Sequence, residues 1–313
     1  MQNLLTVAQQ VAILFVLIGV GAVMRRCRLV STTGVESLVN LLVIVVTPCL
    51  IVDVFQRPFD PSMLRGLLIA FVVASLGHLA VIAWAHFAVR HPNANVMKPL
   101  RLAAVFSNAG FMGIPLEQAI LGDEGVFYGI VYVVVFNLFM WSWGVRSIGR
   151  RERADGDASF SLKSLVNPGT IGIAVGLPLF FLSVKLPAVI KGPVHELACL
   201  NTPVAMIVIG YSLAGARLAR VAVMKCAYVA TAIRLVGYPL AMIAAMYPFR
   251  HLLDRDMMLA VTIAASAPVA AMVSMFAEKF RRDVDVAVAV VSGSTILSIV
   301  TMPVIIALAM AVL

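Results

Sequence analysis

The sequence predicts an all-α integral membrane protein with ten transmembrane helices. Of its 313 residues, 62% are hydrophobic and 12% are charged, whereas a soluble domain carries about 25% charged residues. The apolar residues fall into ten runs, and each run is long enough to cross a bilayer as a helix of about 20 residues. The net charge of +9 therefore records the orientation of the loops. The expected surroundings are lipid, and no nucleic acid is expected as a partner.

Clusters of charged residues separate the ten predicted spans. Arg25 and Arg26 follow the first span at the point where a signal peptide would have small residues for cleavage, so this run is counted as a span. The spans are residues 4–24, 34–55, 63–89, 100–121, 125–148, 168–184, 192–215, 222–249, 257–277 and 284–313.

The positive charges alternate along the chain. Seventeen of the 24 Lys and Arg residues lie in or next to the loops after odd-numbered spans, six lie in or next to those after spans 2, 6 and 8, and Arg234 lies inside span 8. Cytoplasmic loops carry an excess of Lys and Arg. The sequence therefore predicts that the loops after odd-numbered spans are cytoplasmic and that both termini lie outside the cytoplasm.

The longest polar stretch, residues 150–163, separates five spans from five. Because five is odd, two equivalent halves must have opposite orientations in the membrane, as in an inverted repeat. We expect one five-helix repeat at residues 1–149 and a second, inverted repeat at residues 167–313. A cytoplasmic linker at residues 150–166 would join them.

A Thr-Pro pair occupies the same place in both halves. Thr47-Pro48 lies in span 2 and Thr202-Pro203 lies in span 7, 155 residues further along the chain. Proline in a membrane helix often only kinks the helix. These pairs are therefore either kinks or part of a substrate site.

Spans 4 and 9 carry helix-weakening residues near their centres. Non-helical backbone at this depth is tolerated only where protein or a water-filled cavity surrounds it, and paired interruptions in two halves point to a transporter's binding site. A half-helix that begins at the midplane would aim its positive end at an anion. The alternative is close helix packing through small residues. The candidate binding residues are Ser107, Asn108, Gly110, Gly113 and Pro115 in span 4, and Ser266 and Pro268 in span 9.

Four other polar residues inside the predicted spans are functional candidates. Arg234 either pairs with a carboxylate substrate, neutralises the negative ends of the broken helices, or ties down backbone carbonyls. His78 either carries a coupling proton or is a packing residue. Glu117 either shuttles protons or faces a water-filled vestibule, and Asn137 in span 5 is placed to reach the core site.

Two further residues are expected near the membrane surface. Asp53 lies near the outer end of span 2, where its carboxylate can reach water. Trp141 lies towards the cytoplasmic end of span 5, as an interface anchor does.

The motifs together resemble those of the auxin efflux carrier family, over essentially the whole chain. Each motif alone is weak, and their combination is specific. The matching stretches are residues 107–116 with Leu121-Gly122, Thr47-Pro48, Asn167-Pro168 with Gly176, Asn201-Thr202-Pro203 through Gly210 to Leu213-Ala214, and Ala267-Pro268.

The resemblance implies two inverted five-helix repeats, with helices 4 and 9 unwound and crossing at the substrate site. Helices 1, 2, 6 and 7 would form a scaffold, helices 3–5 and 8–10 a mobile transport domain, and the scaffold would hold together a homodimer. Bacterial members resemble permeases for small organic anions such as malate or malonate, and plant members export auxin. The short central loop is similar to that of bacterial members, which implies a bacterial inner membrane. Ser266 stands where some members use asparagine.

The leading hypothesis is secondary active transport of a small organic anion, either auxin-like or a mono- or dicarboxylate, by elevator-type alternating access. The alternative is a cation–proton or sodium-coupled transporter of the same fold, and it is disfavoured because neither predicted crossing contains Asp, Glu or Lys. The chain has no GxxxxGK[ST] stretch for ATP, no HExxH motif and no paired aspartates in facing spans. We therefore expect no enzyme, cofactor or metal site, and either H+ or Na+ as the coupling ion.

Overall fold

The computed structural model describes residues 2–149, 168–215 and 224–313. Within these ranges helix is the only regular secondary structure, apart from one isolated bridge between Ser107 and Val269. The all-α prediction is confirmed for this part of the chain. The predicted linker at residues 150–166 lies outside the described residues.

The helical segments before residue 150 follow predicted spans 1 to 5, and η denotes π-helical segments here. They are α1 (Gln2–Arg26), α2 (Thr32–Leu41), η1 (Leu42–Val46), α3 (Thr47–Val54), α4 (Pro61–Ala88), α5 (Ala94–Val105), η2 (Ala109–Gly113), α6 (Ile114–Phe139), η3 (Met140–Gly144) and α7 (Val145–Gly149).

The segments after residue 167 follow predicted spans 6 to 10. They are α8 (Pro168–Phe181), α9 (Ala188–Cys199), α10 (Asn201–Leu213), α11 (Lys225–Ala232), the π-helical η5 (Ile233–Gly237), α12 (Tyr238–Met246), the 3-10 turn η6 (Tyr247–Phe249), α13 (Arg255–Ser266), α14 (Met272–Lys279) and α15 (Val284–Val312).

Six described helical stretches are long and apolar enough to cross a membrane. They are fewer than the ten predicted spans partly because spans 4 and 9 are interrupted. The chain leaves the helix at residues 106–108 between α5 and η2, and at residues 267–271 between α13 and α14. Neither α5 nor α13 is long enough to count by itself.

The second half of span 4 continues directly into span 5. The stretch Ala109–Gly149 has 41 residues and would measure about 60 Å as a straight helix, twice the hydrocarbon thickness of about 30 Å. Gly122 has a φ of +67°, a conformation that glycine adopts readily. Glu117 lies against Gly129, so α6 folds back at Gly122 as a hairpin.

Three of the four described π-helical segments end two residues before a proline. They are η1 before Pro48, η2 before Pro115 and η5 before Pro239. Proline lacks an N–H and its ring clashes with the carbonyl four residues earlier, and a π-bulge is a known way of bending a helix at such a point. In η1 the hydroxyl of Thr47 donates to the carbonyl of Leu42 over 2.8 Å. Thr47-Pro48 therefore widens its helix locally, as the kink interpretation requires.

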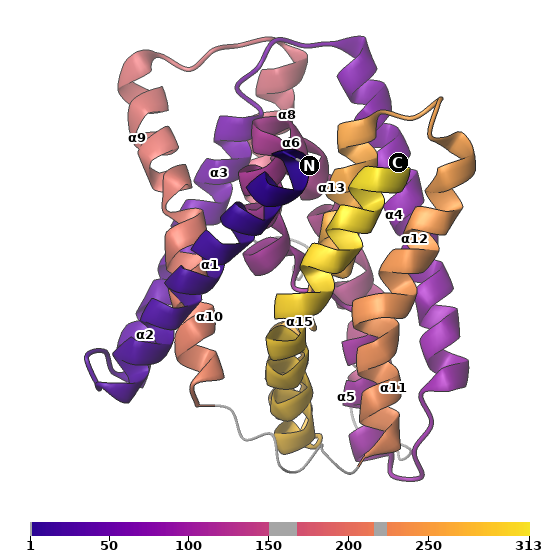
Figure 1. The fold of residues 1–313 in the computed structure, drawn as a ribbon. Coiled ribbons are helices and arrows are strands. Elements are labelled where there is room, and N and C mark those ends of the chain that lie inside the picture. The colour runs from indigo at the N-terminus through magenta and orange to yellow at the C-terminus, as the bar shows by residue number, and fades with distance from the viewer. Residues whose placement is uncertain (1, 150–167, 216–223) are drawn as a thin grey trace.

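The helices form one bundle whose connections alternate between two ends (Figure 1). α1 packs against α10, α3 against α8 and α9, and α13 against α6 and α15. Every residue of α13 from Met257 to Ser266 is buried, which makes this half-helix the centre of the core. The start of α1, the end of α15 and the α3–α4, α8–α9 and α12–α13 loops lie at one end, and the α4–α5 loop lies at the other. Which end faces the cytoplasm stays a prediction.

Candidate functional site

The two helix breaks pair with each other. The N–H of Asn108 donates to the carbonyl of Pro268 over 2.7 Å, and the N–H of Ala270 donates to the carbonyl of Phe106 over 2.9 Å. These bonds flank the antiparallel bridge between residues 107 and 269. Polar backbone groups released by one break are thus satisfied by the other, as burial in an apolar bundle requires.

The position of each break follows from the residues around it. Ala267 precedes Pro268, and a residue before proline avoids the helical region; its φ and ψ are −60° and 148°. In span 4 the break lies at residues 106–108, which include Ser107 and Asn108 and precede Gly110 and Pro115. Gly110 lies within η2, and Pro115 follows this π-helical segment as the second residue of α6, where the widened turn accommodates the missing N–H.

A cavity of about 300 Å³ lies against both breaks. Its wall is mostly apolar, and no charged side chain of the described residues lines it. Its polar side chains are those of Thr47, Ser107, Asn108, Asn137, Thr170 and Asn201. The first four were predicted site residues, and Gly110 also lines the cavity. Sequence reasoning missed Thr170, which no motif marks, and Asn201, which begins the Asn-Thr-Pro motif.

Trp141 also lines this cavity. Its ring packs edge-on against Phe276, with 5.3 Å between ring centroids. The residue was expected only to anchor a span end at the membrane surface. Its place in the wall follows from η3, which continues the returning arm of α6 past Asn137.

Two helices begin at the cavity wall, and a third resumes there. η2 starts after Asn108, α14 starts after Ala271, and α10 resumes after a turn at Leu200. The N–H groups in the first turn of a helix have no partner within the helix, and they carry a positive partial charge. The backbone therefore favours an anion in the cavity without the help of a charged side chain.

Two buried polar atoms at the cavity wall have no hydrogen-bond partner among the described residues. They are the Oγ of Ser107 and the Nδ2 of Asn201, on residues that are 1% and 4% exposed. Buried polar atoms without a partner are rare in native proteins and are candidates for binding a ligand. Both groups can donate a hydrogen bond, as an anion requires. Thr47 and Asn137 already donate to backbone carbonyls of their own helices.

The other predicted binding residues do not line this cavity. The hydroxyl of Ser266 donates to the carbonyl of Ile263 over 2.8 Å, and Pro268 contributes its carbonyl to the pairing of the breaks. Thr202 lines a neighbouring cavity. The predicted residues outside the lining are Pro48, Gly113, Pro115, Thr202, Pro203, Ser266 and Pro268.

Arg234 lies at the ends of both broken helices. Its side chain is fully buried, and its guanidinium donates to the carbonyl of Val105 over 2.7 Å and to that of Ala265. These carbonyls belong to the last turns of α5 and α13, where the helix dipole is negative. The guanidinium also lies 4.7 Å from the ring centroid of Tyr238. Arg234 does not line the 300 Å³ cavity, so its contacts match the helix-end and carbonyl alternatives.

His78 is enclosed by aromatic rings at the centre of α4. It is fully buried, and its Nδ1 donates to the carbonyl of Ala74 over 2.8 Å. Its ring lies 5.4 Å from that of Phe139, in a stacked arrangement, and 5.0 Å from that of Tyr132. Nε2 has no partner within the described ranges. These surroundings are those of a packing residue, and His78 does not line the 300 Å³ cavity.

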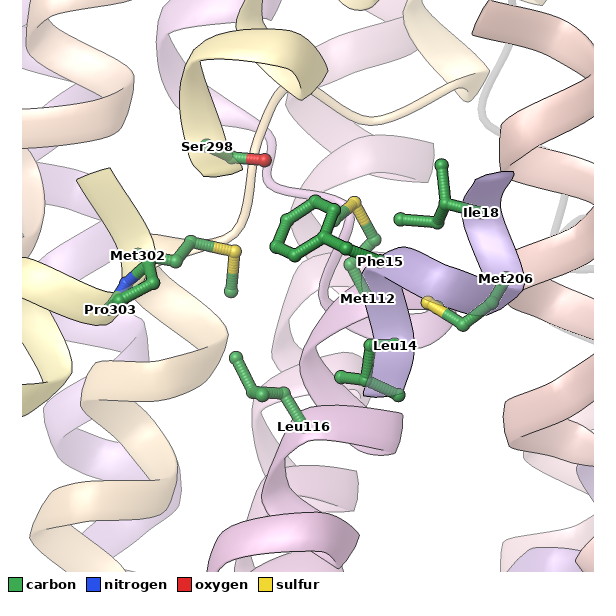
Figure 2. Close-up of a pocket in the computed structure, with 9 residues that line it drawn as sticks. All are labelled: Leu14, Phe15, Ile18, Met112, Leu116, Met206, Ser298, Met302 and Pro303. Carbon is green, nitrogen blue, oxygen red and sulfur yellow. The ribbon is translucent and has the colours of Figure 1, made fainter. Parts of the chain in front are cut away.

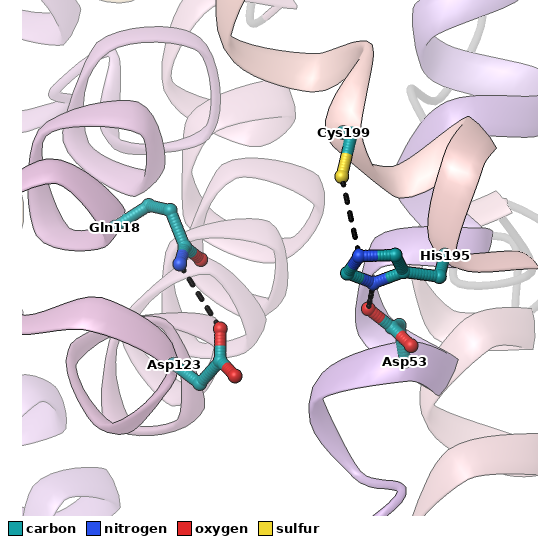
Figure 3. A network of polar contacts seen from close by, with 5 residues as sticks. All are labelled: Asp53, Gln118, Asp123, His195 and Cys199. Carbon is teal, nitrogen blue, oxygen red and sulfur yellow. Dashed lines mark hydrogen bonds and ion pairs between the residues drawn. The ribbon is translucent and has the colours of Figure 1, made fainter.

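A second cavity, of about 190 Å³, adjoins the first and contains a polar network (Figure 3). The Nδ1 of His195 in α9 lies 2.8 Å from a carboxylate oxygen of Asp53 in α3, and its Nε2 lies 3.6 Å from the sulfur of Cys199. Leu50, Ile114 and Asn201 line both cavities. Asp53, which was expected to reach towards water by itself, is therefore paired across two helices beside the larger cavity.

A third cavity, of about 20 Å³, lies between α1 and α10 on one side and α6 and α15 on the other (Figure 2). Leu14, Phe15 and Ile18 of α1 face Met302 of α15 across it, and Met112 and Met206 complete its side. This volume holds one water at most. The cavity marks a dry, methionine-rich contact between helices.

The arrangement is that of a membrane protein with a central anion-favouring cavity between broken helices. No curated protein matches the chain. The family model described as membrane transport protein matches residues 6–306. The chain therefore belongs to the auxin efflux carrier family of membrane transporters.

Proposed function

We propose that the chain is a secondary transporter of a small organic anion, and that the 300 Å³ cavity binds the anion. The observation that carries the proposal is the wall of this cavity. It combines two donors without partners, the starts of two helices and no charged side chain among the described residues. The volume lies at the lower end of the range of about 300–1,000 Å³ for ligand pockets, which fits a mono- or dicarboxylate such as malonate or an auxin-like acid.

We propose further that the chain forms ten transmembrane helices in two inverted repeats, and a homodimer through helices 1, 2, 6 and 7. The antiparallel pairing of the breaks at residues 106–108 and 267–271 supports the inverted repeats, and the homodimer rests on the family resemblance. These breaks lie at equivalent places in the two predicted halves. In this arrangement both termini lie outside the cytoplasm of a bacterial cell.

Alternating access would then operate across the cavity. One wall comes from the proposed scaffold, which includes α3, α8 and α10, and the other comes from the breaks, α6 and α14. Movement of the second wall against the first, as an elevator, would expose a bound anion to each side in turn. The dry methionine-rich contact between α1 and α15 is a surface that tolerates such repacking.

The alternative of a cation transporter is less well supported. A cation needs an acidic side chain or a cluster of oxygen ligands, and no carboxylate of the described residues lines the 300 Å³ cavity. A sodium flux assay after a pH jump separates the two hypotheses, because an organic-anion transporter without substrate would carry no sodium current across the liposome membrane.

Two serines provide a matched test. Ser107→Ala removes an orphan hydroxyl from the cavity wall, whereas Ser266→Ala removes a hydroxyl that is bonded within its own helix and lies outside the lining. The purified protein is screened by thermal shift against dicarboxylates, aromatic acids and amino acids, and the hits are then tested for counterflow in proteoliposomes. We expect Ser107→Ala to weaken carboxylate binding about tenfold or more, so that about ten times more carboxylate is needed for the same rise in melting temperature. Ser266→Ala should need no more carboxylate than the wild type. Equal behaviour of the two variants would contradict the site assignment.

A further inference from the structure

Glu117 is an acidic side chain fully buried inside the bundle. It lies in α6 before the reversal at Gly122, and both of its carboxyl oxygens have no hydrogen-bond partner among the described residues. It packs directly on Gly129 of the returning arm, where a Cβ would overlap the carboxyl group. Gly113 of η2 leaves room on another side, 3.7 Å from Oε1 to the position a Cβ would take. The chain thus makes space for this carboxyl group with Gly129.

No described charged group faces this carboxyl group. Glu117 takes part in no ion pair among the described residues. Asp123 and Glu124 lie at the tip of the hairpin, and Arg255 and Asp256 lie at the start of α13. An isolated buried carboxylate is so unfavourable that such a group binds a proton instead. Burial therefore favours the neutral form of Glu117, and ionisation requires a conformation that opens its carboxyl group to water.

The neighbours of Glu117 on α6 reach both larger cavities. Ile114 lines the 300 Å³ cavity and the 190 Å³ cavity, and Gln118 lines the latter. At about 100° per residue, the side chain of Glu117 points about 60° away from that of Ile114 around the helix. A modest rotation of this half-helix would bring the carboxyl group to water, where it can ionise.

We infer that Glu117 carries a coupling proton, so that the organic anion crosses the membrane together with H+. This inference rests on the proposed function and names the ion that drives it. An anion in the 300 Å³ cavity displaces water and repels an ionised Glu117, so anion binding and proton uptake favour each other. The carboxylate takes a proton from the outer solution, crosses as a neutral acid with the anion, and returns the proton to the inner solution. The carrier without its anion then returns with Glu117 ionised and facing a water-filled cavity.

Proteoliposomes separate coupling from transport. Radiolabelled malonate and indole-3-acetate are followed in two modes, counterflow without a pH gradient and accumulation driven by an acidic exterior. We expect wild-type protein to show both, and Glu117→Gln to keep counterflow but to lose the gradient-driven accumulation and its pH dependence. The control is Glu124→Gln, which removes an exposed carboxylate from the same helix and should leave both modes unchanged.

The outcomes are distinct. Gradient-driven accumulation by Glu117→Gln would overturn the inference. So would a wild-type protein that shows counterflow but never accumulates the anion in response to a pH gradient. In both cases the proposed function would stand. Absence of wild-type counterflow with both probes would remove the proposed function and the inference with it. Should Glu117→Gln fail to fold, proton uptake by the wild type upon addition of malonate is measured with a pH indicator in weak buffer. The inference requires uptake that fades at low pH, and malonate binding without any proton uptake would overturn it.

Discussion

The contact between α1 and α10 depends on two glycines and gives the sharpest stability prediction. A Cβ built on Gly210 would overlap the carbonyl oxygen of Ile18 and lie 2.7 Å from its carbonyl carbon. A Cβ on Gly21 would overlap the oxygen of Ile207 and lie 2.8 Å from its carbonyl carbon. Carbon atoms in contact are separated by about 3.5–4.0 Å, so either alanine forces the two helices about 1 Å apart.

Backbone atoms cannot move away as a flexible side chain can. Overpacking in a well-packed interior costs about 1–3 kcal/mol, and we place Gly21→Ala and Gly210→Ala near 3 kcal/mol because the obstacle is backbone. In proteins of about 150–250 residues, each kcal/mol of lost stability lowers the melting temperature by roughly 2–4 °C. On this scale the apparent melting temperature should fall by roughly 6–12 °C. The double variant should lose less than the sum, because helices already forced apart accommodate the second methyl group.

Gly19→Ala is the matched control. Gly19 lies in the same helix as Gly21, and a Cβ there meets nothing within 4 Å. Alanine favours helix over glycine by about 1 kcal/mol, so Gly19→Ala should leave the melting temperature unchanged or slightly higher. Tryptophan emission during heating in detergent measures all four variants. The reasoning is refuted if Gly21→Ala and Gly210→Ala have the same melting temperature as Gly19→Ala.

Further predictions concern groups outside the cavity. Arg234→Met should lower the free energy of unfolding by about 3 kcal/mol. It removes charge-assisted hydrogen bonds to two helix-end carbonyls, each worth about 1.5–3 kcal/mol, and this loss exceeds the gain from no longer burying a charged guanidinium. Arg234→Lys should restore part of the lost stability in thermal unfolding. His195→Gln should cost less than about 1 kcal/mol despite the contact with Asp53, since exposed ion pairs contribute little, and a larger loss would show that the pair is structural. Hydrogen bonds from Ser62 hold the pKa of Asp60, the cap of α4, below its usual range, so the cap stabilises at neutral pH and loses its effect as the pH falls through that lowered pKa. Melting curves of Asp60→Ala and wild type should therefore separate at neutral pH and converge in acid.

The breaks were predictable because their causes are local. A proline after Ala267 and a polar Ser107-Asn108 step inside an apolar run are visible in the sequence. The exact place of the first break was not predictable. Gly110 and Pro115 lie in the helix that follows the break, where the π-helical segment η2 accommodates Pro115, so neither residue marks the break itself.

The contacts of the buried charges were hidden by their distance along the chain. Arg234 meets carbonyls 129 and 31 residues away, and only the pairing of the two breaks brings those helix ends together. Sequence reasoning offered three partners for this residue and had no means of choosing among them. Glu117 and Gly129 are adjacent because the chain reverses at Gly122. The sequence predicted a reversal there, between spans 4 and 5, but not which residues meet across it.

The cavity itself was only partly predictable. Ser107 and Asn108 were expected in its wall because they lie at a break. Thr170 lies in the wall through α8, and nothing in its sequence neighbourhood indicates a site. Some residues of each motif lie outside the cavity wall, because a helix presents only one face to a cavity. Asn201, for example, lines the cavity and Pro203 does not.

Binding of a carboxylate in the 300 Å³ cavity is the central claim, and Trp141 reports on it directly. The chain has three tryptophans, so Trp84→Phe with Trp143→Phe leaves Trp141, in the cavity wall, as the only one. Its emission is recorded while malonate, malate or phenylacetate is titrated into protein shown to exchange that acid in proteoliposomes. The account predicts a saturable change in emission that Ser107→Ala weakens about tenfold. An exchanged acid that leaves the emission of Trp141 unchanged at saturating concentration would contradict it.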